Sequence, residues 1–212
     1  MNQPSVTTID LLRHGACQDG DIFRGHTDSL LSLLGRQQMQ QALAQHPNKI
    51  TQWHSIFSSP RQRCESFAKG ISDYKIIIKA ALAEISFGDW DGKLIIDIKQ
   101  QSPAAVEQFW SKPAENTPPN GEPFSIFQQR VSDIWADILL TNKGQHNLII
   151  THGGVIRLII AQILQMPIQS LSFLSIPHAC LTQIKIYHHP GLQDWPQLIF
   201  HQPLNTPNHS PL

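Results

Sequence analysis

The stretch Ile9-Asp10-Leu11-Leu12-Arg13-His14-Gly15 closes a run of mostly apolar or β-branched residues that begins at Val6. Such a run predicts a buried strand, which only the charge of Asp10 interrupts. Arg13 and His14 then stand at the carboxyl end of the strand, the edge at which open α/β sheets bind ligands. A planar guanidinium group suits two phosphate oxygens, and a neutral imidazole offers a nucleophilic nitrogen. The stretch therefore indicates a phosphate site at this edge, although an Arg-His-Gly tripeptide also occurs by chance.

The composition is that of an ordinary globular chain. Its 212 residues allow one large domain, 41% of them are hydrophobic and 15% are charged, and the formal net charge is zero. This balance lacks the basic footprint of a nucleic-acid-binding protein. The longest apolar run, residues 155–164, is too short and too interrupted to span a bilayer. We therefore expect no nucleic acid and no membrane as a partner.

The cysteines and histidines predict neither a disulfide framework nor a metal centre. The three cysteines, Cys17, Cys64 and Cys180, are widely spaced and odd in number, which fits a reducing cytosol. None of the eleven histidines stands in an HExxH-type spacing. The first eight residues carry no cationic region followed by an apolar one, so no signal peptide is expected. These observations together predict a cytoplasmic location.

Apolar runs alternate along the chain with amphipathic segments. Strands are predicted at residues 6–12, 53–58, 75–80, 147–151, 180–187 and 198–202, and helices at 33–46, 60–70, 93–101, 104–112, 124–140 and 153–164. Ser59 is expected to cap the second helix, with Pro60 at its first position. Strands that alternate with helices predict an α/β fold, a three-layer α/β/α sandwich with a mostly parallel central sheet. We expect one domain over residues 1–204, followed by a flexible polar tail at 205–212.

Three further stretches end an apolar or strand-like run with polar residues. Ser58 to Arg63 lies between a strand and a helix, where free N–H groups attract anions and two arginines add charge. His152 follows an apolar run, as His14 does. Glu84 stands between apolar neighbours, an environment that favours the protonated form of a carboxyl group. Taken singly, each stretch has a simpler explanation: a solvated first helical turn, a buried histidine, and a carboxylate that caps nearby backbone.

Together, the stretches resemble the motifs of the histidine phosphatase superfamily, also called phosphoglycerate mutase-like, over about residues 6–164. The matching segments, in chain order, are Arg13-His14-Gly15, Ser58-Ser59-Pro60 with Arg63, Glu84 ahead of Phe87-Gly88-Asp89-Trp90-Asp91-Gly92, and Thr151-His152-Gly153-Gly154. Gly121-Glu122 is similar to the Gly-Glu-Ser element of the family, with Pro123 in place of the serine. Four motifs in one order are far more specific than any one of them. The resemblance implies a phosphoglycerate mutase-like fold.

The resemblance also implies a role for each of five residues. His14 is the expected nucleophile, which takes the phosphoryl group as a phosphohistidine. Arg13, Arg63 and His152 are expected to bind the phosphoryl oxygens and to neutralise charge in the transition state. Glu84 is expected to protonate the leaving oxygen and then to assist the attack of water. Because the arginines supply the positive charge, no metal or other cofactor is expected.

Two departures from the family pattern concern the pocket. The family often places Glu-Thr or Glu-Ser and then a phosphate-contacting asparagine after its first motif, where this chain has Ala16-Cys17 and Gly20. Thr27 or a loop N–H group is expected to make that contact instead. Arg61 stands where the family often has an apolar residue, which leaves Arg63 as the expected pocket cation. The substrate-binding residues predicted from these segments are Arg24, Gly25, Thr27, Phe87 and Gly153.

Within the family, the sequence favours a phosphatase over a mutase. Mutases carry a basic insertion, whereas residues 111–122 contain one lysine and no arginine pair. Phe87 and Gly154 stand where mutases usually have a tyrosine and an asparagine. Residues 23–28, 58–64 and 85–92 look most like α-ribazole phosphatases, which remove the 5′-phosphate from α-ribazole phosphate during assembly of the cobalamin lower ligand.

Two alternatives to this interpretation stay open. One is a broad-specificity phosphatase or sugar-bisphosphatase on the same scaffold, with a phosphoglycerate mutase less favoured. The other is a phosphate-binding module without turnover, against which the joint presence of His14, Arg63, Glu84 and His152 argues. In the favoured interpretation the partner is a small-molecule phosphate monoester.

Overall fold

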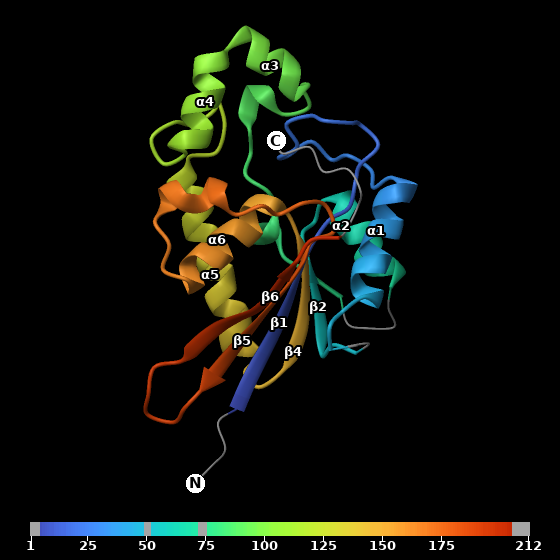
Figure 1. Cartoon of the computed structure of the whole chain (residues 1–212), viewed down its shortest axis with the longest axis vertical. Helices are drawn as coiled ribbons and strands as arrows, with labels where there is room; N and C mark the ends of the chain where they lie inside the picture. Colours follow the sequence, from blue (N-terminus) through green and yellow to red (C-terminus); the bar gives the residue numbers. More distant parts are fainter. Residues whose placement is uncertain (1–4, 49–51, 72–75, 205–212) are drawn as a thin grey trace.

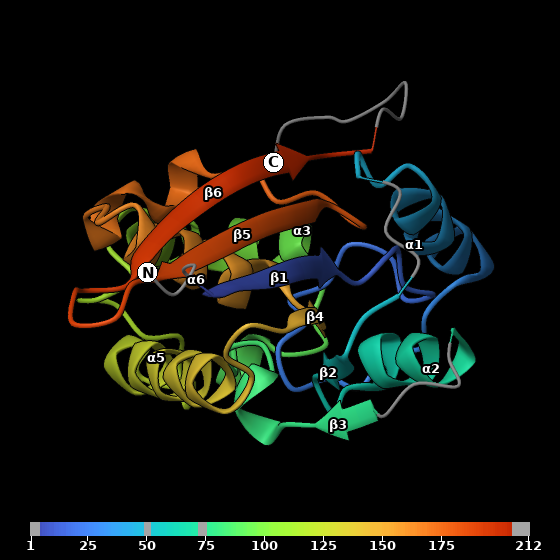
Figure 2. The ribbon, with the colours of Figure 1, turned by 90° about the horizontal axis from the view of Figure 1, so that it is seen from below.

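The computed structural model describes residues 5–48, 52–71 and 76–204, which form an α/β fold around a six-stranded sheet (Figure 1). The strands are β1 (Ser5–Arg13), β2 (Ser55–Ser58), β3 (Ile76–Ile78), β4 (His146–Thr151), β5 (Leu181–His188) and β6 (Trp195–Gln202). Their order in the sheet is β3-β2-β4-β1-β5-β6, which Figure 2 shows from below. Strands β1 to β4 run parallel to their neighbours among themselves, while β5 runs antiparallel to both β1 and β6.

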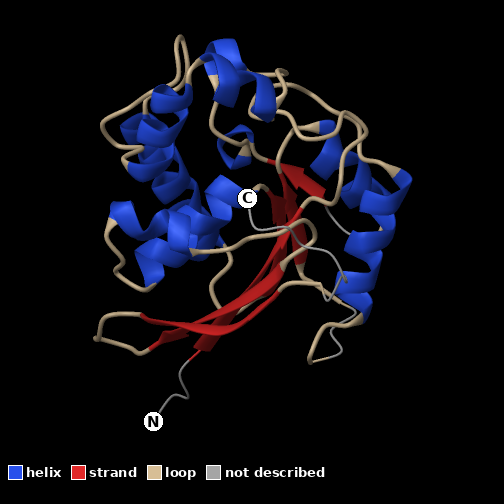
Figure 3. Ribbon diagram, turned by 45° about the horizontal axis from the view of Figure 1, so that its top comes forward, coloured by secondary structure: helices blue, strands red, loops and turns tan. Residues whose placement is uncertain are grey.

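Helices cover both faces of the sheet (Figure 3). On one side lie α1 (Leu33–Ala44) and α2 (Gln62–Gly70), and on the other lie α5 (Phe124–Thr141) and α6 (Gly153–Ile163). Two shorter helices, α3 (Ile95–Gln101) and α4 (Pro103–Ser111), lie beyond the carboxyl ends of the parallel strands (Figure 1). The predicted α/β class, with three layers and a mostly parallel sheet, is confirmed.

The central strand β1 shows why the sheet needs helices on both faces. Successive side chains of a strand point to opposite faces, and both faces of β1 are buried. Ile9 and Leu11 pack in the apolar cluster that includes Val131 of α5 and Val155 of α6. Leu12 packs in the second cluster, with the buried residues of α1 and α2. Each face of the strand is therefore covered by its own pair of helices.

Most predicted elements are present, and the corrections lie at their ends. The second helix begins at Gln62 rather than Pro60, because the Ser59 hydroxyl accepts a hydrogen bond from Arg61 N (3.3 Å) and Arg61 becomes the N-cap. Short 3₁₀ helices occupy parts of the predicted loop at 81–92, at η1 (Ala80–Leu82) and η2 (Gly88–Trp90), and η3 (Ile168–Phe173) was not predicted. Strand β3 is shorter and β6 longer than expected. The predicted tail at 205–212 lies outside the described residues.

The one charge of the first strand, Asp10, is fully buried and fully paired. Its carboxylate accepts hydrogen bonds from Trp53 Nε1 (2.8 Å) and Gln183 Nε2 (2.9 Å). His146 Nε2 and His46 Nε2 lie 2.8 and 3.2 Å from its oxygens. Burial by itself raises the pKa of Asp10, but the hydrogen bonds from His146, His46 and Trp53 outweigh it and hold that pKa below its usual range. The buried carboxylate therefore stays ionised.

The turn after β1 packs directly against the backbone of α1. A Cβ atom on Gly15 would lie 2.1 Å from the carbonyl oxygen of Gly35, and one on Gly35 would lie 2.0 Å from that of Ala16. The hydroxyl of Ser32, the N-cap of α1, also accepts from Gly35 N and donates to the Ala16 carbonyl, both at 2.9 Å. Helix α1 thus holds the segment that follows the first motif, and only glycine permits this approach.

We expect Gly35→Ala to destabilise the protein, although alanine is the better helix former by about 1 kcal/mol. Its methyl group would overlap the Ala16 carbonyl, and overpacking of this kind costs about 1–3 kcal/mol. For a chain of this size each kcal/mol corresponds to a fall of about 2–4 °C in Tm. Thermal unfolding followed by circular dichroism measures the change.

Gly70→Ala is the matched control, because the nearest atom to its new methyl group is the flexible end of the Arg36 side chain. A Tm of Gly35→Ala equal to or above that of wild type would contradict the packing argument.

Candidate active site

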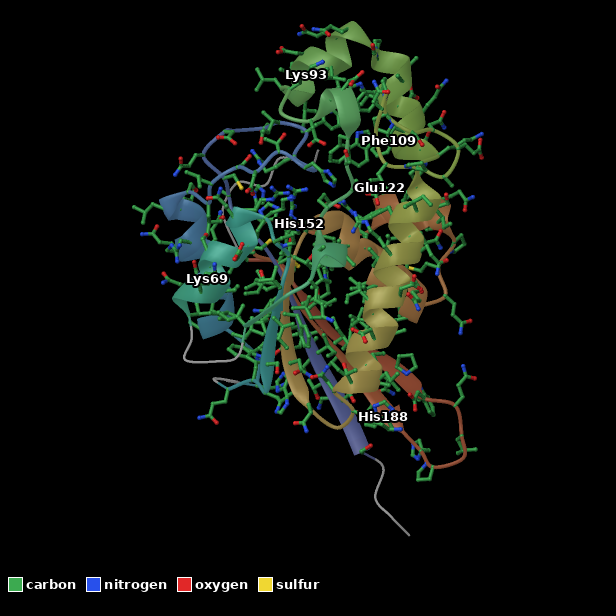
Figure 4. All side chains as sticks on the ribbon, turned by 180° about the vertical axis from the view of Figure 1, so that it is seen from behind. Lys69, Lys93, Phe109, Glu122, His152 and His188 are labelled. Atoms are coloured by element: carbon green, nitrogen blue, oxygen red, sulfur yellow. The ribbon has the colours of Figure 1, made fainter. Side chains whose placement is uncertain are left out.

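The carboxyl ends of the neighbouring strands β1, β4 and β2 bring three of the predicted motifs together. His14 N donates to the Thr151 carbonyl, and Ser59 N to the Ile150 carbonyl, both at 3.0 Å. His152 follows β4 directly, as the N-cap of α6. Figure 4 shows it at the end of the sheet nearer α3 and α4, with His188 at the opposite end. Residues far apart in the sequence therefore share one edge, as predicted from the first strand.

The imidazole of His14 is held in one tautomer. Its Nδ1 lies 2.8 Å from the carbonyl oxygen of Gly15, which accepts but cannot donate. Nδ1 therefore carries the hydrogen, and Nε2 keeps its lone pair. Burial, followed by neighbouring His152, Arg13 and Arg63, lowers the pKa of His14 well below its ordinary value. The ring is accordingly neutral, with a nucleophilic nitrogen on the side away from Gly15.

Arg13 is the cation nearest in sequence to His14. Its Nη1 donates to the Ile176 carbonyl, while its buried Nε has no hydrogen-bond partner among the described residues. Burial and the neighbouring guanidinium of Arg157 lower the pKa of Arg13 to about 10. The group is therefore charged at neutral pH, and part of its hydrogen-bonding capacity is left for an anion.

The Arg63 guanidinium is fully buried and surrounded by acceptors. Its Nη1 donates to the Thr27 carbonyl (2.8 Å), and its Nη2 donates to the carbonyls of Arg24 (3.1 Å) and Gly25 (2.9 Å). Its Nε donates to His152 Nδ1 at 3.3 Å. Most of its donors therefore bind the backbone of the loop at 24–27. Its positive charge lies next to the His152 ring.

His152 is fixed by two contacts that define its tautomer. Because Arg63 only donates, His152 Nδ1 is an acceptor, and Nε2 carries the hydrogen that points to Ser59 Oγ, 2.7 Å away. Burial, then Arg63 and Arg13, lowers the pKa of His152 well below its ordinary value. Its ring centroid lies 5.2 Å from that of His14. The predicted pair of histidines is therefore brought together, with both rings neutral.

Arg61, two residues before Arg63, is only partly buried. Its Nε is buried and has no hydrogen-bond partner among the described residues. Its charge contributes to the lowered pKa of His26, after burial, and to that of His152. The Arg61 guanidinium therefore lies close enough to His26 and His152 to disfavour the protonation of both rings.

Glu84 comes from the loop between β3 and η2 and meets the start of α6. Its two carboxyl oxygens accept from Gly154 N (2.9 Å) and Ile85 N (3.0 Å). A Cβ atom at position 154 would lie 2.3 Å from Glu84 Oε1. The Glu84 carboxyl group therefore occupies space that any side chain at position 154 would fill.

Arg130 and Glu122 clamp the loop that carries Glu84. Arg130 donates to Glu122 through Nε (2.7 Å) and Nη2 (2.8 Å), a bidentate pair. The same guanidinium donates to the backbone carbonyls of Ala81, Ala83 and Glu84. Glu122, from the Gly-Glu element, thus helps to position the acidic residue.

The remaining predicted substrate-binding residues have mixed surroundings. Gly25 and Thr27 contribute carbonyls to Arg63, and their N–H groups donate to Asp91 Oδ1. Arg24 Nε donates to Ser29 Oγ (3.0 Å), close to the same loop. Phe87 is buried against Phe23 and Phe109 and belongs to the apolar core. Gly153 lies at the start of α6, where a Cβ atom would be 3.5 Å from Arg13 Nε.

Two side chains at this edge were not predicted. His178, just before β5, has its ring centroid 5.5 Å from that of His14. Arg157 of α6 donates from Nε to the Leu174 carbonyl (2.9 Å), and its Nη1 would lie 3.7 Å from a Cβ atom on Gly153. An antiparallel strand brings its amino end to the edge where parallel strands end. A polar residue just before such a strand is the signal that could have located His178.

Residues 5–48, 52–71 and 76–204 contain neither a membrane-spanning helix nor a cluster of metal ligands. No helix there combines the length and the apolar character that a bilayer span requires. No three histidine, cysteine or acidic side chains there are grouped so that they could hold a metal ion.

Comparison with known proteins agrees with the fold. The chain is 28% identical over 187 residues to the adenosylcobalamin/alpha-ribazole phosphatase of Escherichia coli K12, covering 83% of this chain and 88% of that protein. It is also 28% identical over 170 residues to the metal-independent phosphoserine phosphatase of Arabidopsis thaliana, covering 77% and 71%. The crystal structure of the alpha-ribazole phosphatase from Shigella flexneri matches with a TM-score of 0.72 at 27% identity, covering 84% and 89%.

The family comparison spans nearly the whole described chain. The model of the histidine phosphatase superfamily, branch 1, matches residues 9–195, from the first strand to the start of the last. That range contains His14, Glu84 and His152. The chain therefore belongs to branch 1 of the histidine phosphatase superfamily and is a phosphomonoesterase.

Proposed function

We propose that this enzyme hydrolyses α-ribazole 5′-phosphate through a phosphohistidine formed at Nε2 of His14. The observation that carries the chemistry is the hydrogen bond from Nδ1 of His14 to the Gly15 carbonyl, which leaves Nε2 as the nucleophile. Burial and the neighbouring guanidinium groups keep that ring neutral. A neutral imidazole among arginines suits attack on an anionic phosphate ester.

In the first step, Nε2 of His14 attacks phosphorus and the bond from phosphorus to the leaving oxygen breaks. Glu84, in its protonated form, gives a proton to that oxygen, so the leaving group departs as an alcohol. Arg13 and Arg63 offset the negative charge of the transferring group, Arg13 by direct contact and Arg63 from its buried position. His152 lies beside His14 as a neutral ring, and its two nitrogens contact the Arg63 side chain and the Ser59 hydroxyl.

In the second step, water attacks the phosphoryl group of the phosphohistidine. The Glu84 carboxylate, regenerated in the first step, takes a proton from that water while the bond from phosphorus to nitrogen breaks. Inorganic phosphate leaves, and His14 and protonated Glu84 return to their starting states. The Arg130–Glu122 clamp would keep the carboxyl group in place for both transfers.

The choice of substrate rests on the relatives and on what residues 111–122 lack. Two of the named relatives are α-ribazole phosphatases, and this segment carries no arginine pair for a substrate carboxylate. Phosphoserine is the second candidate, because the chain is just as similar to a phosphoserine phosphatase.

We expect α-ribazole 5′-phosphate to be the preferred ester, with a kcat/KM at least about tenfold above its competitors, a difference of about 1.4 kcal/mol in transition-state binding. Steady-state kinetics with α-ribazole 5′-phosphate, phosphoserine, 3-phosphoglycerate and p-nitrophenyl phosphate measures the ratios. Similar values for all four esters would support a broad-specificity phosphatase, and a preference for phosphoserine would support the second candidate.

We expect His14→Ala to lower kcat by on the order of 10⁴ or more, because the covalent route is lost. Rapid quench of the wild-type enzyme should trap a phosphoenzyme that is labile in acid and stable in base, as a phosphoramidate is. Cys17→Ala is the control, since its thiol lies only 3.9 Å from His14 Nδ1 and is the rival nucleophile nearby. Loss of the phosphoenzyme in Cys17→Ala, with His14→Ala still active, would reverse the assignment.

We expect Glu84→Gln to slow phosphoenzyme formation from α-ribazole 5′-phosphate by about 10²–10⁴, the usual contribution of a general acid. The same step with p-nitrophenyl phosphate should slow much less, because a phenolate leaves without a proton. Single-turnover measurements are needed, since slowed hydrolysis of the phosphoenzyme hides the difference in the steady state. Asp89→Asn, an exposed carboxylate on the same loop, is the matched control. Equal losses with both esters would remove Glu84 from the role of acid.

A further inference from the structure

We propose that His178 is a further phosphate-binding group, whose imidazole donates a hydrogen bond to an oxygen of the phosphoryl group held at His14. The inference rests on the proposed function, because it assigns a ligand contact within the same site. His178 stands where the chain enters β5, outside the four motifs that resemble the family.

The first support is the position of the ring. The His178 and His14 centroids are 5.5 Å apart with an interplanar angle of 47°, and the side chain is half-buried. A phosphoryl group on the edge of His14 that faces His178 would lie within hydrogen-bonding reach of the second ring. His178 is also among the neighbours that lower the pKa of His14. The ring therefore lies beside the nucleophile rather than at a distant part of the pocket.

The second support is the scaffold that fixes the segment before β5. The Leu174 carbonyl accepts from Arg157 Nε at 2.9 Å, and the Ile176 carbonyl accepts from Arg13 Nη1. These two arginines of the site thus hold the backbone immediately before His178.

The backbone on the other side of His178 is fixed as well. Ala179 N donates to the His14 carbonyl at 3.2 Å, and the Cys180 carbonyl accepts from Arg13 N at 3.1 Å. Ala179 adopts a φ of +56°, a left-handed conformation that costs a non-glycine residue energy and needs support from its surroundings. The chain therefore turns sharply next to His178 and is held in that turn by the two residues of the first motif.

The third support is that neighbouring donors of the pocket are already engaged by the protein. Arg63 and His152 direct donors to protein acceptors, the loop carbonyls and Ser59. An imidazole N–H from His178 would add a donor for the phosphoryl oxygens.

The test compares His178→Met with His178→Gln in the full-length chain. The two replacements have the same length, but only glutamine offers an N–H donor. We expect His178→Met to raise the Kd for inorganic phosphate, measured by calorimetry, by about 10–100-fold, the usual effect of losing a hydrogen bond to a charged group. We expect His178→Gln to recover most of that affinity. The KM for p-nitrophenyl phosphate should follow the same order.

His54→Ala is the control, because this exposed histidine lies at the start of β2, at the opposite end of that strand from the site. Unchanged phosphate affinity in His178→Met would overturn the inference, and so would equal losses in the methionine and glutamine variants, since those indicate packing alone. In either case a wild-type enzyme that turns over esters leaves the proposed function intact. A wild type that neither binds phosphate nor hydrolyses esters would refute both.

Discussion

The buried guanidinium of Arg63 is the constraint on which the pocket depends. A cation taken out of water needs acceptors on all sides, and here three backbone carbonyls and a histidine nitrogen supply them. Those carbonyls belong to the loop at 24–27, so that loop must cross the carboxyl edge of the sheet. Asp91 in turn accepts from the N–H groups of Gly25 and Thr27 and from Phe87 N. One buried charge thus connects the loops after β1 and β3 to the start of α2.

The same positive charge serves the chemistry twice. Burial, and then the guanidinium groups around the two central imidazoles, disfavour their protonation, which keeps the attacking nitrogen available near neutral pH. The same guanidinium groups stabilise the negative charge of the phosphoryl group during its transfer. Arg157 and Arg13 lie close enough for each to disfavour further positive charge, as the lowered pKa of Arg13 indicates. An anion in the pocket would relieve this repulsion, so binding of a phosphate ester is favoured before any specific contact to its leaving group.

The sequence allowed prediction of the layers and of the motif residues that meet at the sheet edge, because apolar runs and strand-end polar residues are local signals. It did not reveal the environment of those residues. Arg63 could be identified as a cation near the site, but not as a group saturated by loop carbonyls, since those contacts join residues 36 to 39 positions apart. Phe87, which the sequence singled out as a substrate contact, packs against Phe109 of α4, a contact that no local pattern indicates. His178 escaped prediction because its position follows from the reversed direction of β5.

The Asp10 network at the middle of the first strand also bears on how the chain folds. Two of its partners, His146 and Gln183, lie 136 and 173 residues away in sequence. Contacts of such long range form late, because the entropy of closing large loops must be overcome first. Before β4 and β5 pair with β1, Asp10 lacks its hydrogen bonds to His146 and Gln183. Burying β1 at that stage would bury an incompletely paired carboxylate, which is strongly unfavourable. Partly assembled sheets are thereby penalised, and the amino- and carboxyl-terminal strands are coupled into one cooperative transition.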